Sequence, residues 1–548
     1  MPIETTSVEY ETMVVGAAYL VKQLLSRLGV VPAIDQALTY QPEIEATYGQ
    51  LSQVIITNRL SFQPVPIYEM AAWAQKHGMD QVFALQAAWL DDDRLGALLE
   101  GVADHSATIW TTIIQNAVQR FQVDLDWLHA DTSTIYFEGV YEDEPGQPKG
   151  GEQDIPLLVE GYNKDGQRNK VQLVLSLITS GRMPLWHHPW AGNHTDEGVY
   201  VADMNALRQA LFAAGNAVLI GDRKLGTTAN QLALCRQGQQ FITAHPWTDT
   251  AKAVWLATYQ QLQAGQLSWT PVDYASRNKA RQPLEKRPRY QVCEIQQALA
   301  DPETHQVYPL RWVFIHCSDK AEQDARQRDK ALQAGEQALR RIAGLLGKYD
   351  YKDRPTIETR LTEALRKAKA QRYFSYTLQG TAEGQDWVLR WQRQEAVINN
   401  EQCFDGIALL SSNVLVSRLS AGAVMVKYKE QVYVEQTIDF IKSPVQIRPM
   451  WLHKPKRLVG LTLLIMIAVL VAALLEHQIR RWIAKTGQKL KGLMPEGRDN
   501  PYPTAKALLR AFGDYALVVR NDEHGSEVHP AKLRSIQQQI WDALDLPP

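Results

Sequence analysis

Alternating polar and apolar positions mark a strand at Leu125–Phe137 (LDWLHADTSTIYF), which is rich in β-branched and aromatic residues and contains no glycine or proline. Successive side chains of a strand point to opposite faces, so Asp131 shares one face with Trp127 and His129. A carboxylate in the middle of a strand is costly unless something pairs with it. Asp131 is therefore a candidate functional residue, and the alternative is an aspartate that neighbouring hydroxyl or backbone groups satisfy.

Helical spacing of apolar residues dominates the chain before this strand. It predicts helices at Val15–Leu28, Tyr48–Leu60, Ile67–His77 and Ser106–Phe121. Gly29 is expected to end the first of them, since glycine favours the position after a helix. Residues 1–122 should thus form a helical domain, which either binds or pairs DNA or is a cap without a ligand.

Residues 123–235 change to an α/β pattern. Further strands are expected at Ile155–Tyr162 and Lys170–Ile178, joined by a hairpin turn at Asp165-Gly166. A helix at Val199–Ala214 then leads to the short apolar strand Ala217–Asp222, which ends in Asp222. This order predicts an α/β layer with an antiparallel meander on one side.

Residues 236–400 are expected to be a β-rich insertion, with several strand-like runs around a long polar helix at Ala321–Leu346. An apolar seam covers only two heptads of this helix, so packing against a neighbour is favoured over an extended coiled coil. The seam consists of Leu332, Leu339, Ile342 and Leu346.

Core-like patterning returns in residues 401–495, with a strand at Asp405–Ser412 and a helix at Tyr428–Lys442. The run Leu458–Leu475 is long and apolar enough to cross a membrane. Both of its flanks are basic, so the loop-charge rule gives no membrane orientation. A buried core helix and a single-span membrane protein are the alternatives. Residues 496–548 should form a small α/β tail. Its predicted elements are Thr504–Phe512, Tyr515–Arg520 and Lys532–Leu544.

One polar edge of the helix predicted at Tyr428–Lys442 combines an aromatic, an amide, an acid and a base, beside an apolar stripe that would dock the helix on a core. The polar residues are Tyr428, Gln431, Glu435 and Lys442, and the stripe is Val434, Ile438 and Ile441. Taken alone, such a pattern also suits an ordinary amphipathic helix with a solvated polar face.

Together these residues resemble the DDE triad of ribonuclease H-like transposases, with an Asp in an early strand, an Asp ending a later strand and a Glu on a late helix. The helix YKEQVYVEQTIDFIK is similar to the Tyr-x2-Arg-x3-Glu-x6-Lys signature of a branch of insertion-sequence transposases that carries a β-rich insertion before the glutamate. Further similarities are Gly161–Gln172, Ala191–Asp196 and Asp405-Gly406.

The resemblance implies a fold and a set of roles. The fold would be α/β, a ribonuclease H-like catalytic core (123–235 and 401–495) interrupted by the insertion, with the N-terminal helical domain and the C-terminal tail outside it. Asp131, Asp222 and Glu435 would be catalytic residues and metal ligands, whereas Tyr428, Gln431 and Lys442 would contact DNA.

Gln431 stands where the signature has arginine. Glutamine keeps a hydrogen-bonding group but lacks the charge and the two-pronged phosphate contact of arginine. This difference keeps two alternatives open, a related metal-dependent nuclease and an inactive descendant of a transposase.

The chemistry of three carboxylates agrees with phosphodiester cleavage. Hard cations such as Mg²⁺ prefer carboxylate oxygens, and two such ions can stabilise both the attacking and the leaving oxygen. We therefore expect two Mg²⁺ ions, with Mn²⁺ as a substitute. Water would attack first, and the freed 3′-hydroxyl would then attack target DNA without a covalent protein intermediate.

The net charge of −2 gives no overall attraction to DNA, so binding would depend on local basic clusters. Such clusters occur at Arg277–Arg289, Arg366–Arg372 and Arg448–Arg457. Any one of them could be a solvated surface, but three in a nearly neutral chain favour contact with phosphates. Within the first cluster the expected DNA-binding residues are Arg281, Lys286, Arg287 and Arg289.

Cysteine and histidine usage indicates no common zinc motif. The four cysteines are far apart and form no C-x-x-C pair, which fits a reduced cytosolic compartment. His187, His188 and His194 lie close in sequence, yet their spacing matches no usual zinc pattern. The N-terminus lacks the features of a signal peptide.

The sequence therefore predicts a cytoplasmic, prokaryotic transposase associated with the nucleoid. It would cleave double-stranded DNA at the terminal inverted repeats of an insertion sequence and join the ends to target DNA. By the same resemblance we expect a homodimer on DNA and no association with a membrane. The transposase fold that this chain resembles has a core helix directly after the glutamate-bearing helix, so we expect Leu458–Leu475 to be a buried core helix rather than a membrane span.

Overall fold

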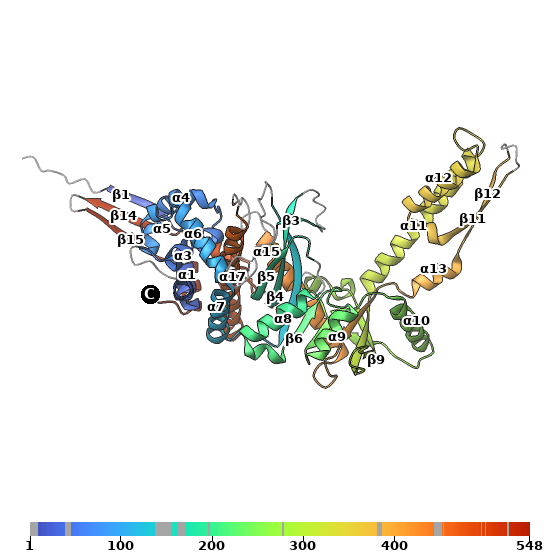
Figure 1. The fold of residues 1–548 in the computed structure, drawn as a ribbon, viewed down its shortest axis with the longest axis horizontal. Coiled ribbons are helices and arrows are strands. Elements are labelled where there is room, and N and C mark those ends of the chain that lie inside the picture. Colours follow the sequence, from blue (N-terminus) through green and yellow to red (C-terminus); the bar gives the residue numbers. More distant parts are fainter. Residues whose placement is uncertain are drawn as a thin grey trace, which may run out of the picture. The chain divides into compact units, whose positions relative to one another are not determined.

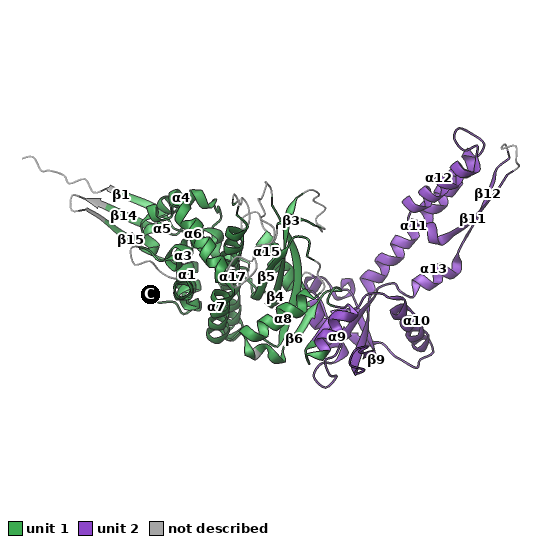
Figure 2. Cartoon of the chain, in the orientation of Figure 1, with its two compact units in different colours: residues 1–225, 236–240, 430–548 green, residues 226–235, 241–429 purple. Residues whose placement is uncertain are grey.

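The computed structural model describes residues 9–38, 45–137, 156, 158–161, 170–194, 198–276, 279–380, 386–442, 452, 454–494, 496–498, 500–522 and 525–547. The fold is mixed α/β (Figure 1). The chain divides into two compact units (Figure 2). Unit 1 comprises residues 1–225, 236–240 and 430–548, and unit 2 comprises residues 226–235 and 241–429. The five predicted domain boundaries stay predictions.

The N-terminal part of unit 1 is helical, as the apolar spacing predicts. Its helices are α1 (Ala18–Leu28), α2 (Val30–Ala37), α3 (Tyr48–Leu60), α4 (Met70–Lys76), α5 (Met79–Phe83), α6 (Asp92–Asp104) and α7 (Ser106–Phe121). The predicted bounds of α3 and α7 are confirmed. Gly29 ends α1 with a φ of 68°, a left-handed conformation that glycine adopts without strain.

A small sheet of unit 1 joins segments near both ends of the chain; the sequence predicted its element at Tyr515–Arg520 but not the other two strands. Strand β1 (Glu9–Val14) pairs antiparallel with β14 (Ala516–Asp522), which in turn pairs with β15 (Gly525–Pro530). Two C-terminal helices, α18 (Ala505–Arg510) and α19 (Ser535–Ala543), confirm the α/β character of the tail.

The main sheet of unit 1 begins with β2 (Trp127–Tyr136). Strands β4 (Val171–Ser180) and β5 (Met183–Ala191) continue from it as an antiparallel meander, and β3 (Val159–Glu160) pairs with the start of β4. On its other side β2 pairs in parallel with β6 (Val218–Gly221), which follows helix α8 (Val199–Ala210). This confirms the predicted meander. The turn expected at Asp165-Gly166 lies outside the described residues.

The helix predicted at Tyr428–Lys442 is wrong in its extent. Helix α14 (Ala421–Lys429) of unit 2 ends before Glu430, and α15 (Val432–Lys442) of unit 1 begins after Gln431. Tyr428 therefore belongs to a different helix from Glu435, and the four polar residues do not share one helical edge. The apolar stripe of α15 is nevertheless buried, as expected.

The long apolar run lies in α17 (Pro455–Thr486), the one helix among the described residues that is long and apolar enough to cross a membrane. All of its apolar window is buried inside unit 1, where α17 packs against α3, α6 and β5. Its approach to α6 is close, because a Cβ on Gly460 would lie 2.0 Å from the Leu99 carbonyl oxygen. The prediction of a buried helix is confirmed.

Unit 2 contains an antiparallel sheet in the order β7-β13-β10-β9-β8. Its strands are β7 (Gln240–Ala244), β8 (Thr270–Val272), β9 (Tyr290–Ala300), β10 (Val307–Cys317) and β13 (Ile407–Ser412). Helix α9 (Thr228–Arg236) begins the unit, and α10 (Asp249–Gln263) buries Trp255 against Phe314 of β10. The expected strands are present, but the region from 236 to 400 also contains several long helices.

Unit 2 includes an arm of helices and a β-hairpin (Figure 2). This arm has its own hydrophobic core. Helix α11 (Ser318–Leu345) packs against α12 (Arg354–Lys367) and the hairpin of β11 (Phe374–Gln379) and β12 (Val388–Arg393). Leu332, Leu339 and Ile342 of the predicted seam are buried in this core. The seam therefore packs against a neighbour, as expected.

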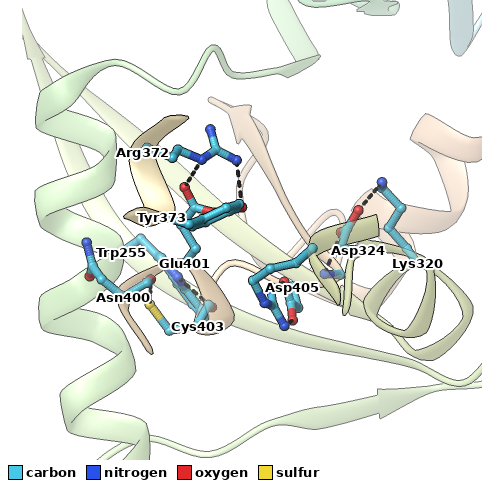
Figure 3. Close-up of polar contacts among 11 residues, drawn as sticks. Trp255, Lys320, Asp324, Arg372, Tyr373, Asn400, Glu401, Cys403 and Asp405 are labelled. Atoms are coloured by element: carbon cyan, nitrogen blue, oxygen red, sulfur yellow. Dashed lines mark hydrogen bonds and ion pairs between the residues drawn. The ribbon is translucent and has the colours of Figure 1, made fainter. Parts of the chain in front are cut away.

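A network of polar contacts fixes the turn from α13 (Glu395–Gln402) into β13 (Figure 3). Arg328 of α11 holds both carboxylate oxygens of Asp405, at 2.6 and 2.7 Å. Gly406 has a φ of 72°, and its N–H donates to Asp324 at 3.0 Å. Asp405 thus has a structural partner, and Gly406 occupies a left-handed position that favours glycine.

Candidate functional site

In the sheet of unit 1, Asp131 and Asp222 lie at the same height along two neighbouring parallel segments of the chain. The parallel ladder of β2 and β6 runs from Trp127–Val218 to Ala130–Gly221, so Asp131 is the next residue of β2 and Asp222 directly follows the end of β6. Neighbouring strands lie about 4.8 Å apart. Both aspartates are half-buried. The two aspartates thus occupy neighbouring backbone positions at the end of β6.

Local sequence explains why Asp222 lies there. The strand before it, Val218–Gly221, is fully buried, whereas the chain turns directly after it. The Leu225 N–H donates to the Asp222 carbonyl at 3.1 Å, and the Lys224 N–H donates to Oδ1 of Asp222 at 3.0 Å. An aspartate side chain that accepts from the backbone two residues later is a common way to begin a turn. The turn therefore holds the carboxylate at the strand end.

A buried tyrosine on α8 contacts Asp222 of this pair. The phenol of Tyr200 donates to Oδ1 of Asp222 at 3.0 Å, and its side chain is 1% exposed. Burial raises the pKa of Tyr200 well above its ordinary value, and the negative charges of Asp222 and Asp131 add to this effect. Tyr200 was missed by sequence reasoning, because nothing in the apolar pattern of its helix indicates which strand end it reaches.

Gln431 connects α15 to the same strand. Its side-chain Nε2 donates to the Ala130 carbonyl at 2.8 Å, directly before Asp131, and the residue is 6% exposed. Glu435 lies one turn later, where its N–H donates to the Gln431 carbonyl at 3.3 Å. The glutamate is thus in the first turn of a helix that packs against β2.

Glu435 itself is largely exposed. Partial burial of its carboxyl raises its pKa, and the charge of Asp439 one turn further along α15 adds to the shift. The sequence analysis did not single out Asp439. Its position four residues after Glu435, one helical turn away, is the signal that would have indicated an interaction between the two carboxylates. Among the described residues no three acidic, histidine or cysteine side chains are arranged as a metal site. The structure therefore brings Asp131 and Asp222 together, but does not join Glu435 to them.

The aspartate pair nevertheless fits a magnesium ion. Mg²⁺ keeps several waters and is usually held by one or two carboxylates together with substrate phosphates. Asp131 and Asp222 supply such a pair of hard oxygen donors at one edge of the sheet. Glu435 would serve a second ion only if its side chain approached the pair when DNA is bound.

The remaining residues of the signature differ in their surroundings. Gln431 is buried against the backbone of β2, so in this conformation its amide faces the protein interior. Lys442 is the last residue of α15 and is half-buried. Tyr428 is half-buried on α14 of unit 2. Their contact with DNA stays a prediction.

The basic segment of unit 2 forms two short turns, Lys279–Arg281 and Leu284–Lys286. Arg287 donates to the carbonyls of Gln282 and Ala280 at 2.8 and 2.7 Å, and so braces the segment. The other three basic residues predicted to bind DNA are exposed, namely Arg281, Lys286 and Arg289. Arg277, the first residue of the cluster, lies outside the described residues.

The three clustered histidines do not converge. His187 is buried against Trp110, with ring centroids 4.7 Å apart, whereas His188 and His194 both contact Trp190. Burial lowers the pKa of His187 to about 3, and the nearby His188 acts in the same direction. A neutral histidine in an aromatic contact is a core residue, and the described residues offer no zinc site there.

Comparisons with known proteins give a family match and a similar solved structure. The family described as "Domain of unknown function (DUF4277)" matches residues 10–115, from β1 into α7. No curated protein matches the chain. Among solved structures, the piggyBac transposase synaptic complex with hairpin DNA is similar over 90% of this chain and 79% of that chain. The sequence identity is 9% and the TM-score is 0.35.

Proposed function

We propose that this protein is a DDE transposase with a ribonuclease H-like core, which cleaves DNA at the inverted repeats of an insertion sequence and transfers the cut strands to target DNA. The observation that carries the proposal is the β2–β6 register, which sets Asp131 beside Asp222 at the end of a parallel strand pair. In α/β sheets this edge is where ligands bind. The motif order in the sequence supplies the reaction class.

In this mechanism the chain's own residues bind and orient the scissile phosphate. Mg²⁺, when bound, would supply Lewis-acid stabilisation of the attacking and leaving oxygens. Asp131 and Asp222 would hold the cation and keep its charge directed at the phosphate. Glu435 would complete the site from α15, whose position on β2 is set by Gln431 and by buried Val434, Ile438 and Ile441.

The test is single-turnover cleavage of a labelled duplex that carries the inverted repeat flanking the gene, first with Mg²⁺ and then with Mn²⁺. Asp131→Asn, Asp222→Asn and Glu435→Gln should each slow cleavage by about a thousand-fold or more, because several kcal/mol of charge stabilisation is lost. Their binding to the duplex should persist. Asp126→Asn removes an exposed carboxyl just before β2 and is the matched control.

Two outcomes would change the assignment in different ways. Near-normal cleavage by Asp131→Asn would remove the proposal, since every other role is placed relative to that strand. Near-normal cleavage by Glu435→Gln alone would move the third carboxylate elsewhere, and Asp439 and Glu430 would be tested next.

The second candidate is a metal-dependent nuclease of the same fold class, which the substitution of Gln431 for arginine favours. A nuclease would cut the duplex but would not join its 3′-end to a target plasmid. An inactive descendant would bind the inverted repeat and do neither. A strand-transfer assay on the wild-type protein therefore separates the three possibilities.

A further inference from the structure

We infer that Tyr200 is a positioning residue for the metal site, because its phenol fixes the carboxylate of Asp222 in the orientation that faces the site with Asp131. The inference rests on the proposed function and adds a residue that the DDE resemblance does not include. Its basis is a set of contacts that join α8, β2 and β6 around the two aspartates.

Tyr200 is itself held firmly. It lies in the first turn of α8, a helix that packs against β4 and β5. The buried face of this helix consists of Val199, Tyr200, Asp203, Met204, Leu207 and Ala210. A tyrosine ring with 1% exposure inside such packing has little freedom, so its hydroxyl is a fixed donor.

The hydroxyl of Tyr200 reaches the same oxygen as a backbone donor. Oδ1 of Asp222 accepts from the Tyr200 phenol at 3.0 Å and from the Lys224 N–H at 3.0 Å. Two donors from different directions restrict rotation of the carboxylate about its Cβ–Cγ bond. The Asp222 side chain is therefore oriented before any ligand arrives.

The contacts extend to the strand that bears Asp131. The Thr132 side chain also hydrogen-bonds to Tyr200, and the Thr132 N–H donates to Oδ1 of Asp131 at 2.7 Å. Thr132, Tyr200 and Asp222 thus form a hydrogen-bonded chain from β2 to the end of β6. Thr132 contacts Tyr200 through its side chain and the Asp131 carboxylate through its backbone N–H.

A role in packing alone would not require the hydroxyl. Phenylalanine would fill the same space, whereas a buried phenol has to find a partner or lose free energy. Groups that hydrogen-bond metal-ligating carboxylates orient them, and their removal typically lowers metal affinity or activity about 10- to 100-fold. We expect this range for Tyr200.

The experiment uses the full-length protein and Tyr200→Phe, which keeps the ring and removes the hydroxyl. Mn²⁺ binding is measured directly by titration with electron paramagnetic resonance detection of free Mn²⁺. The variant should bind Mn²⁺ about 10- to 100-fold more weakly, and half-maximal cleavage should need a correspondingly higher Mg²⁺ concentration. Excess Mn²⁺ should restore much of the cleavage rate.

Tyr373→Phe is the matched control. Tyr373 is also buried and also donates its phenol hydrogen to a carboxylate, that of Glu401, but it lies in the arm of unit 2 (Figure 3). This control should leave Mn²⁺ binding unchanged. Thr132→Val breaks the hydrogen-bonded chain from the β2 side and should weaken Mn²⁺ binding in the same direction. It keeps the inference testable if Tyr200→Phe does not fold.

The outcomes separate the inference from the proposed function. Wild-type Mn²⁺ affinity in Tyr200→Phe and in Thr132→Val, together with lost binding in Asp222→Asn, would overturn the role of Tyr200 and leave the metal site intact. Undiminished Mn²⁺ binding in both Asp131→Asn and Asp222→Asn would instead overturn the metal site itself.

Discussion

Asp131 and Asp222 show what a sequence can reveal about single residues. Each stands out because a carboxylate interrupts or ends an apolar strand, and the parallel register then places the two side by side. Tyr200 and Gln431 act through contacts with residues far along the chain. No local pattern encodes such contacts, so the roles of these two side chains emerge only from the fold. For Glu435, the sequence predicted the helix that carries it but not its distance from Asp131 and Asp222.

Asp203 provides a residue-scale test by pH. Burial raises its pKa to about 7 from 3.8. Compared with an aspartate of ordinary pKa, the protonated Asp203 carboxyl therefore contributes its full stabilisation of the folded state below pH 3.8. This contribution is lost as the pH rises through 7. Asp203→Asn cannot ionise, so at pH 8 it should be more stable than the wild type by up to about 4 kcal/mol, at about 1.4 kcal/mol per pKa unit.

The measurement for Asp203 is urea unfolding of both proteins between pH 5 and pH 8. The difference in unfolding free energy between variant and wild type should grow with pH across this range. Asp93→Asn changes an exposed aspartate of α6 and should show no such trend. A constant difference for Asp203→Asn would mean that the buried carboxyl has an ordinary pKa in the folded protein.

At the scale of elements, periodicity identified most helices and strands but not where α14 ends and α15 begins. Apolar spacing continues across Glu430 and Gln431, so the sequence predicts one helix, whereas the structure has two in different units. Tertiary contact explains the break, because Gln431 turns its side chain to the backbone of β2. Strand β1 was missed for a related reason, since it is defined by pairing with a strand at the opposite end of the chain.

The ion pairs of one buried glutamate in α17 offer a test of what stabilises this apolar helix in the core of unit 1. Glu476 follows its apolar run and is 3% exposed, and it pairs with Arg182 and Arg480, each at 2.7 Å. It also accepts from the Ala505 N–H at 2.8 Å. Glu476→Gln leaves two arginines beside a neutral group, so unfolding free energy should fall by about 3–5 kcal/mol.

Chemical denaturation at pH 7 measures this loss. Glu336→Gln is the control, because Glu336 pairs with two arginines on the solvated surface of the arm, where ion pairs contribute little to stability. Carbonate extraction of the expressed wild-type protein provides an independent check. Membrane association that resists extraction would contradict a buried α17.

At the scale of the whole molecule, charge is nearly balanced, so any affinity for DNA has to come from particular surfaces. The sequence identified the basic segment 277–289 by composition but could not tell which of its charges face solvent. In the structure Arg287 donates to backbone carbonyls, whereas Arg281, Lys286 and Arg289 are exposed. The exposed side chains are therefore the ones expected to contact phosphates, and Arg287 is expected to maintain the shape of the segment.

This division of roles predicts a salt effect. A variant with Arg281, Lys286 and Arg289 changed to glutamine should bind the inverted-repeat duplex more weakly. The slope of log K against log salt concentration should become shallower by about 0.9 for each lost phosphate contact. Binding isotherms from about 50 to 200 mM salt measure that slope.

The matched control neutralises three cations of α11 that are already paired with carboxylates one turn away. These are Lys320, Arg326 and Arg340, whose partners are Asp324, Glu322 and Glu336. A cation that is already paired with a carboxylate neutralises little phosphate charge and releases few counterions from DNA, so this triple variant should keep the wild-type slope. If both triple variants share the wild-type slope, the basic segment 277–289 does not contact the DNA backbone, and the clusters at Arg366–Arg372 and Arg448–Arg457 are the next to be tested.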